Sequence, residues 1–245
     1  MAKFTQNEAW ADTLRLTRAH WAALIAIAGV FNFLPTLLVN HFFPMEEPPL
    51  DADAQTYIQF VLDYYRQNAL PVVLQSFLVM VGSAAMLRLV FARTGTVGSA
   101  LLFGIAWLPV YSILIVLMNF AIGAGVILLI VPGLYLLGRL LPASPAMVAE
   151  ERRNPLDALR RGWALSEGHG WLVVSLYLLV AIPAGILMLA ISLVTGIVFK
   201  AAAGPQLGSL LEMIVLCAMQ AVAATLLTML TAAVYRALAP QKPGV

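Results

Sequence analysis

Five long apolar stretches divide the chain and limit what it can fold into. They cover residues 21–40, 69–91, 99–141, 171–199 and 207–235. A helix needs about 20 apolar residues to cross the hydrocarbon core of a membrane, because each residue rises about 1.5 Å. The third stretch is long enough for two crossings, and we place its turn between Asn119 and Gly125, where an amide and two glycines interrupt the run.

The sequence therefore predicts an all-α fold, a polytopic transmembrane helical bundle that forms a single membrane domain over residues 1–245. The six predicted spans are 21–40, 69–91, 99–118, 120–141, 171–199 and 207–235. Composition supports this class: 62% of the residues are hydrophobic and 11% are charged, whereas soluble domains carry about 45–50% and about 25%. A net charge of +2 does not indicate a nucleic-acid binder.

The basic residues predict the orientation. With six spans, 12 of the 14 Lys and Arg residues fall on one face and only Arg66 and Lys200 on the other. The first face carries Lys3, Arg15, Arg18, Arg88, Arg93, Arg139, Arg152, Arg153, Arg160, Arg161, Arg236 and Lys242. Because basic residues gather on the cytoplasmic side, we expect both ends of the chain to be cytoplasmic. The acidic segment 41–68 is then periplasmic, with a short helix over 53–68.

Two polar segments on the basic face have helical periodicity. One is the lead before Trp21, and the other lies in the cytoplasmic loop 142–170, where Pro155 opens a helix. Arginines flank an apolar stripe in both, which is typical of amphipathic helices lying at an anionic membrane surface. The alternative is that each segment simply extends the span that follows. The lead and the second segment also resemble each other, which suggests an internal duplication or a chance match.

Pro132 and Gly133 interrupt the predicted fourth span. Proline removes a backbone donor, and the break frees carbonyl groups inside the membrane. Two interpretations are open: a kink that lets helices pack, or a discontinuous helix that lines a ligand site. Arg139 ends this span on the basic face, where its guanidinium can reach headgroup phosphates or the carboxylate of Glu150 or Glu151. Arg160, Arg161 and Trp163 are the other candidate lipid contacts.

Polar residues inside the spans are few. Asn32, Gln75, Asn119 and Gln220 are expected to hydrogen-bond between helices. Glu212 lies near the outer start of the last span, with Lys200 as its expected partner.

No pattern in the sequence indicates catalysis. The three histidines lack the spacing of a metal site, and no phosphate-binding or nucleophile motif is present. We expect no catalytic residues, no cofactor and no metal. Ser166 is expected to cap a helix N-terminus. The single cysteine, Cys217, is expected to pack between helices.

A family resemblance rests on residues 125–180. Ile130-Val-Pro132-Gly133-Leu-Tyr135-Leu, then Arg139, precedes a loop with Pro145 and Glu150. A helix of the type Asn154-Pro155-Leu-x-Ala158-Leu-x-x-Gly-Trp163-x-Leu-Ser166 follows. Together these segments resemble the YciC-like bacterial membrane proteins and the membrane domain attached to some glycerophosphodiester phosphodiesterases. The resemblance implies a location in the bacterial inner membrane, without an activity for the membrane domain itself.

Three functions stay open at this point. The first is a lipid-interacting or membrane-organising protein without catalytic chemistry, whose partners are membrane lipids and in particular anionic headgroups on the cytoplasmic face. The second is a transporter or channel for a small solute or lipid, with its site at Pro132 and Gly133. The third is a membrane-embedded enzyme that acts on lipid headgroups. A second copy of the chain, or another membrane protein, is a further candidate partner.

Overall fold

Every regular element in the computed structural model, which describes residues 5–45, 53–92 and 95–239, is helical. The all-α prediction is confirmed. The elements are α1 (Gln6–Ala28), the π-helical turn η1 (Gly29–Phe33), α2 (Leu34–Phe42), α3 (Ala54–Gln67), α4 (Ala69–Phe91), α5 (Val97–Leu128), α6 (Ile130–Leu140), α7 (Ala143–Ala149), α8 (Pro155–Leu165) and α9 (Gly170–Leu238). Lys3, Arg93 and Lys242 lie outside the described residues.

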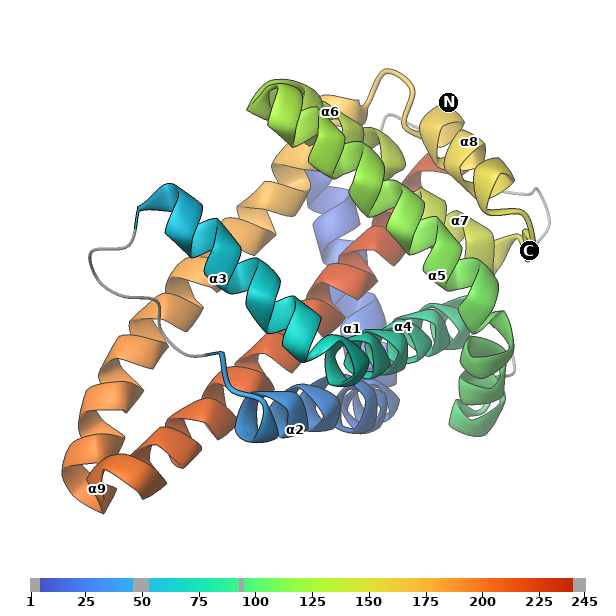
Figure 1. Cartoon of the computed structure of the whole chain (residues 1–245). Coiled ribbons are helices and arrows are strands. Elements are labelled where there is room, and N and C mark those ends of the chain that lie inside the picture. The colour runs from blue at the N-terminus through green and yellow to red at the C-terminus, as the bar shows by residue number, and fades with distance from the viewer. Residues whose placement is uncertain (1–4, 46–52, 93–94, 240–245) are drawn as a thin grey trace.

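Four helices in this part of the chain are long and apolar enough to cross a membrane. They are Gln6–Phe42, Ala69–Phe91, Val97–Leu128 and Gly170–Leu238. The fourth doubles back on itself, because the backbone leaves helical geometry at Gly204, with φ 79° and ψ 168°. Figure 1 shows its two arms meeting in a sharp turn at the far end of the molecule. Four long apolar helices are consistent with a membrane protein.

The turn between α5 and α6 differs from the prediction. We expected it between Asn119 and Gly125, but α5 continues to Leu128 and the break falls at the extended residue Leu129. Glycine inside an apolar helix does not end it when the residue serves packing instead. Here Gly125 lies against Gly133, and a Cβ on Gly125 would come within 2.9 Å of the Gly133 Cα. The fourth predicted span, 120–141, is therefore divided between the end of α5 and the short helix α6.

The N-terminal lead is not a separate helix either. α1 runs unbroken from Gln6 to Ala28 and includes Trp21. Helix growth is cooperative, and no glycine or proline lies near Trp21 to stop it. The lead also has a buried face, with Ala9, Thr13 and Leu16 each at most 5% exposed. Further on, η1 precedes Pro35, whose missing amide accounts for the local change of helical geometry.

Helix α3 forms where the sequence predicts a short helix. Asp53 caps its N-terminus by accepting a 2.8 Å hydrogen bond from the amide of Thr56. The hydroxyl of Tyr64 donates to the carbonyl of Phe43 at 2.9 Å, which ties α3 to the end of α2.

The ends of several helices meet at one end of the bundle. Gln6 in α1 donates to Ser175 in α9, and Asp12 lies 3.5 Å from Arg236 near the end of α9. Arg88 in α4 pairs with Glu151 after α7. Eight of the described arginines take part in these contacts, end a neighbouring helix or belong to the α7–α8 region: Arg15, Arg88, Arg139, Arg152, Arg153, Arg160, Arg161 and Arg236. We call this region the basic end; in Figure 1 it lies to the right, opposite the turn of α9.

The packed core lies near the basic end. Fully buried side chains come from α1, α4, α5, α7 and both ends of α9, among them Leu24, Met86, Leu114, Met147, Leu176 and Met229. Toward Gly204 the arms of α9 expose a series of large apolar residues. In the most apolar 18-residue window of α9, only 17% of the residues are buried. Such a surface suits lipid rather than water.

Candidate functional site

The Pro132–Gly133 motif forms the start of α6. Pro132 lies in the first turn of this helix, where a missing amide costs nothing because the amide would have no helical partner. Gly133 packs directly on α5: a Cβ there would lie 2.3 Å from Val126 Cγ2 and 2.7 Å from the Val126 backbone nitrogen. The motif therefore lies at the tight turn of a hairpin formed by α5 and α6. This arrangement differs from both sequence-based interpretations, the kink and the discontinuous helix.

Arg139, in the last turn of α6, has its guanidinium buried among aromatic rings. The residue is 6% exposed, and its Cζ lies 4.3 Å from the centre of the Trp163 ring and 5.9 Å from that of Tyr135. Trp171 also contacts Tyr135, with ring centres 5.8 Å apart. Gly170 leaves space for the arginine stem, since a Cβ there would meet Arg139 Cδ at 3.0 Å.

The guanidinium of Arg139 has no anionic partner among the described residues. Its Nε is buried without a hydrogen bond, and the predicted pairing with Glu150 or Glu151 does not form. Stacking on Trp163 offsets part of the desolvation of the cation, but a buried charge is strongly disfavoured without a counter-charge. We call Arg139, Tyr135, Trp163 and Trp171 the arginine cage. Trp163 and Trp171 are 40% and 52% exposed, so the cage opens to the surroundings through its tryptophans.

Glu150 binds two other arginines of this region, Arg152 and Arg161. Its carboxylate accepts hydrogen bonds from Arg161 at 2.8 Å, from Arg152 at 2.6 Å and from the Tyr235 hydroxyl at 3.0 Å. Partial burial acts to raise the pKa of Glu150, but these hydrogen bonds together outweigh burial and hold the pKa below its ordinary value. The guanidinium of Arg161 therefore already has a partner within the protein. Arg160 is exposed and lies 3.9 Å from Asp157.

Ser166 is placed differently from the prediction. It is fully buried at the C-terminal end of α8, not at a helix N-terminus. Its hydroxyl donates to the carbonyl oxygen of Arg139 at 2.8 Å, and the carbonyl oxygen of Gly162, at 2.9 Å, is a second acceptor within reach. The serine therefore joins the end of α6 to the end of α8 and fixes Arg139 relative to Trp163.

The predicted intramembrane polar residues do not form one group. Gln75 donates to the Thr36 hydroxyl at 3.1 Å, which confirms a hydrogen bond between helices α4 and α2. Asn32 is buried in η1 beside Gly82, and its side-chain oxygen has no partner. Asn119 is exposed on the surface of α5.

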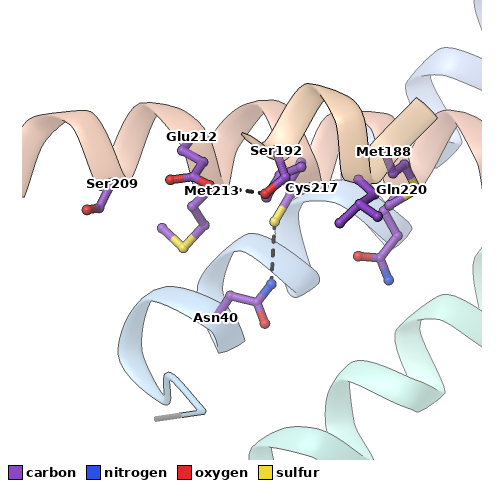
Figure 2. Close-up of a pocket in the computed structure, with 10 residues that line it drawn as sticks. Asn40, Met188, Ser192, Ser209, Glu212, Met213, Cys217 and Gln220 are labelled. Carbon is purple, nitrogen blue, oxygen red and sulfur yellow. Dashed lines mark hydrogen bonds between the residues drawn. The ribbon is translucent and has the colours of Figure 1, made fainter. Parts of the chain in front are cut away.

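Gln220 and Glu212 line a cavity of about 520 Å³ far from the arginine cage. It lies between α2 and the two arms of α9, and Figure 2 shows Ser192 meeting Glu212 and Asn40 reaching Cys217. Lys200 pairs with Glu212 at 3.3 Å, as the sequence predicts. Cys217 is buried at a helix contact, also as predicted. A second cavity, of about 410 Å³, is an apolar groove between α1 and α9. Neither cavity is lined by Pro132 or Gly133.

Sequence reasoning missed several partners in both places. For the arginine cage these are Tyr135 and Trp171. Tyr135 stands four residues before Arg139, on the same helix face, which is a usable signal. In the cavity the missed residues are Asn40 and Ser192, which come from helices whose approach no local pattern encodes.

Comparison with known proteins yields no relative: no family model, no curated protein and no solved structure matches the chain. Within the described residues no group of three or more His, Cys, Asp or Glu side chains could hold a metal ion. The class that the fold defines is an all-α protein whose described residues include four apolar helices long enough to span a membrane, and the function is inferred from the sites alone.

Proposed function

We propose that this chain is an integral membrane protein that binds the phosphate of anionic lipids at its basic end. The observation that carries the proposal is Arg139, a buried guanidinium whose Nε has no partner, set among the aromatic rings of the arginine cage. A lipid phosphate supplies the missing negative charge and the hydrogen-bond acceptors that a guanidinium binds best. The partly exposed tryptophans suit the headgroup level of a bilayer.

The proposed topology has six passes. We count α1 with α2, α4, α5, the short returning helix α6, whose last turn holds Arg139, and the two arms of α9. Each arm of α9 is longer than a membrane crossing requires, which is about 20 residues. The gathering of arginines at one end supports a cytoplasmic basic end and a location in the bacterial inner membrane. The exposed apolar residue Leu156 of α8, near Trp163, supports contact of this helix with the membrane surface.

The other sequence-based hypotheses have less support. The resemblance to YciC-like proteins and to the phosphodiesterase-linked membrane domain stays a prediction. The expectation that the chain is not an enzyme also stays a prediction. Transport through Pro132 and Gly133 is not favoured, because Gly133 packs against Val126 instead of lining either described cavity.

The test compares two arginines that differ only in their surroundings. The protein is placed in bilayer nanodiscs of phosphatidylcholine, with or without phosphatidylglycerol, and its unfolding temperature is measured. We expect anionic lipid to raise this temperature for the wild type and for Arg160→Gln, whose exposed side chain is outside the cage. Arg139→Gln should lose most of the rise. An equal rise in Arg139→Gln and the wild type would refute the proposal, as would an equal loss in both variants.

A further inference from the structure

The cavity of Figure 2 has a mainly apolar lining that includes several polar side chains. It lies toward the turn of α9 at Gly204, away from the basic end, and its volume is about 520 Å³. Its polar lining residues include Asn40, Ser192, Glu212 and Gln220, while Met188, Leu189, Met213 and Leu216 line the rest. Polar atoms facing a cavity among apolar helices need partners, so the nature of the lining indicates the nature of the ligand.

Glu212 is held in place but only partly satisfied. One carboxylate oxygen accepts from the Ser192 hydroxyl at 3.2 Å, and the other lies 3.3 Å from the Lys200 ammonium. A carboxylate offers about four acceptor positions, so about half remain for a ligand. The Glu212 side chain is 17% exposed, whereas that of Lys200 is 51% exposed. The negative group therefore lies inside and the positive group at the rim.

Glycine makes this placement possible. A Cβ on Gly196 would come within 3.0 Å and 3.1 Å of the two carboxylate oxygens of Glu212. A larger residue at position 196 would push the carboxylate out of its position between the two arms of α9. The arms also approach closely at their turn, where a Cβ on Gly208 would lie 2.6 Å from the backbone of Lys200.

Two amides add further acceptors. Asn40 uses its Nδ2 to donate to the Cys217 sulfur at 3.6 Å, which leaves its oxygen free in the described structure. Gln220 lines the cavity from the same arm of α9 as Glu212. The free acceptor positions of Glu212 favour a ligand group that carries N–H donors. A primary ammonium has three such donors, and a quaternary ammonium has none.

We propose that this cavity binds the primary ammonium headgroup of an aminophospholipid. The ammonium lies at Glu212, the phosphate lies at Lys200 on the rim, and the apolar wall contacts the start of the acyl chains. Adaptable methionines such as Met188 and Met213 suit such a contact. The order of charges, negative inside and positive at the rim, is complementary to a phosphoethanolamine zwitterion. This site is separate from the arginine cage and does not depend on it.

The test measures selectivity between two lipids that differ only in their amine. Wild-type protein in phosphatidylcholine nanodiscs is titrated with phosphatidylethanolamine and, separately, with its trimethylated counterpart of the same chains, and retained lipid is counted by native mass spectrometry. We expect a preference for the primary amine on the order of tenfold, the effect of charge-assisted hydrogen bonds that the trimethyl group cannot make. Equal retention of the two lipids would overturn the proposal.

Variants locate the site. Glu212→Gln keeps the shape of the side chain and should abolish the preference, whereas Glu151→Gln, a matched change at the basic end, should keep it. Gln220→Leu offers a second probe that leaves the Ser192–Glu212–Lys200 contacts intact, and it should weaken the preference in folded protein. A preference that survives in both Glu212→Gln and Gln220→Leu would refute the assignment.

Two further arms separate the alternatives. Free ethanolamine carries the same ammonium without acyl chains; competition at the concentration at which the lipid binds would show that the ligand is a soluble amine and would overturn the lipid assignment. Arg139→Gln should keep the preference for the primary amine. Arg139→Gln therefore tests the anionic-lipid proposal, and Glu212→Gln tests the cavity proposal, so the two proposals can fail separately.

Discussion

The hydroxyl of Tyr235 donates to the carboxylate of Glu150 at 3.0 Å, across 85 residues of sequence. This bond joins the last turns of α9 to the residue that follows α7. Arg152 and Arg161 share the same carboxylate, so a single acid holds three segments together at the basic end.

We therefore expect stability to depend on the protonation of Glu150. Its pKa is lower in the folded protein than its ordinary value, so its contribution to stability is present above that ordinary value, about 4.5, and is lost as the pH falls through the lower folded value. Glu150→Gln should lower the unfolding temperature near neutral pH, and the gap from wild type should narrow as the pH falls below the ordinary value of 4.5. Glu167→Gln, at an exposed position, serves as the control. A gap that stays constant with pH would contradict this account.

Substitution of Gly133 should destabilise the hairpin of α5 and α6. In Gly133→Ala the new methyl group overlaps Val126, including its backbone, which cannot move like a side-chain end. Overpacking of this kind costs about 1–3 kcal/mol. Gly123→Ala is the control, since nothing lies within 4 Å of a Cβ there, and alanine favours a helix by up to about 1 kcal/mol. Thermal unfolding in detergent measures the stability of both variants. Equal unfolding midpoints for Gly133→Ala and Gly123→Ala would show that the close contact at Gly133 is not needed.

Loss of the Ser166 hydroxyl should also weaken the fold. In Ser166→Ala the buried carbonyl of Arg139 loses its side-chain donor, at a cost of about 1 kcal/mol. Ser76→Ala removes only a local bond to Val72 on an exposed face of α4, so we expect little change. Because Ser166 positions Arg139, the alanine variant should also show a smaller response to anionic lipid. A full response would mean that the cage forms without this bond.

The proposed topology predicts opposite labelling of two engineered cysteines. In a Cys217→Ala background, Ala202→Cys lies beside the turn of α9 and Ala164→Cys lies on α8; both positions are exposed. A membrane-impermeant maleimide added to intact spheroplasts should label the first and reach the second only after lysis. Labelling of both before lysis would place the two positions on one side and exclude the six-pass arrangement.

The sequence predicted what depends on bulk polarity and failed where contact geometry decides. The apolar stretches follow from the cost of burying polar groups in lipid, and the grouping of arginines is a charge pattern along the chain; both are visible without a structure. The turn at Leu129 was missed because Gly125 is a contact residue and not a helix breaker. A single sequence does not distinguish these two roles of glycine.

The sites show the same division. Arg139 and Trp163 were both selected from sequence as lipid contacts, and they lie together because α6 and α8 are joined through Ser166. Arg161 was also selected as a lipid contact, but its guanidinium binds Glu150 instead. The pairing of Lys200 with Glu212 was predictable because the two flank one short turn. Asn40 was not, because it reaches the cavity from a helix far away in sequence.

The contact between α1 and α9 has a consequence for biosynthesis. Gln6 and Ser175 are separated by 169 residues, which a ribosome adds in roughly ten to thirty seconds at about 5–20 residues per second. Throughout that interval Ala9, at the start of the buried face of α1, lacks the α9 residues that later cover it. Closure of the bundle is thus among the last events of translation, and insertion factors or neighbouring lipid must shield the first helix until then.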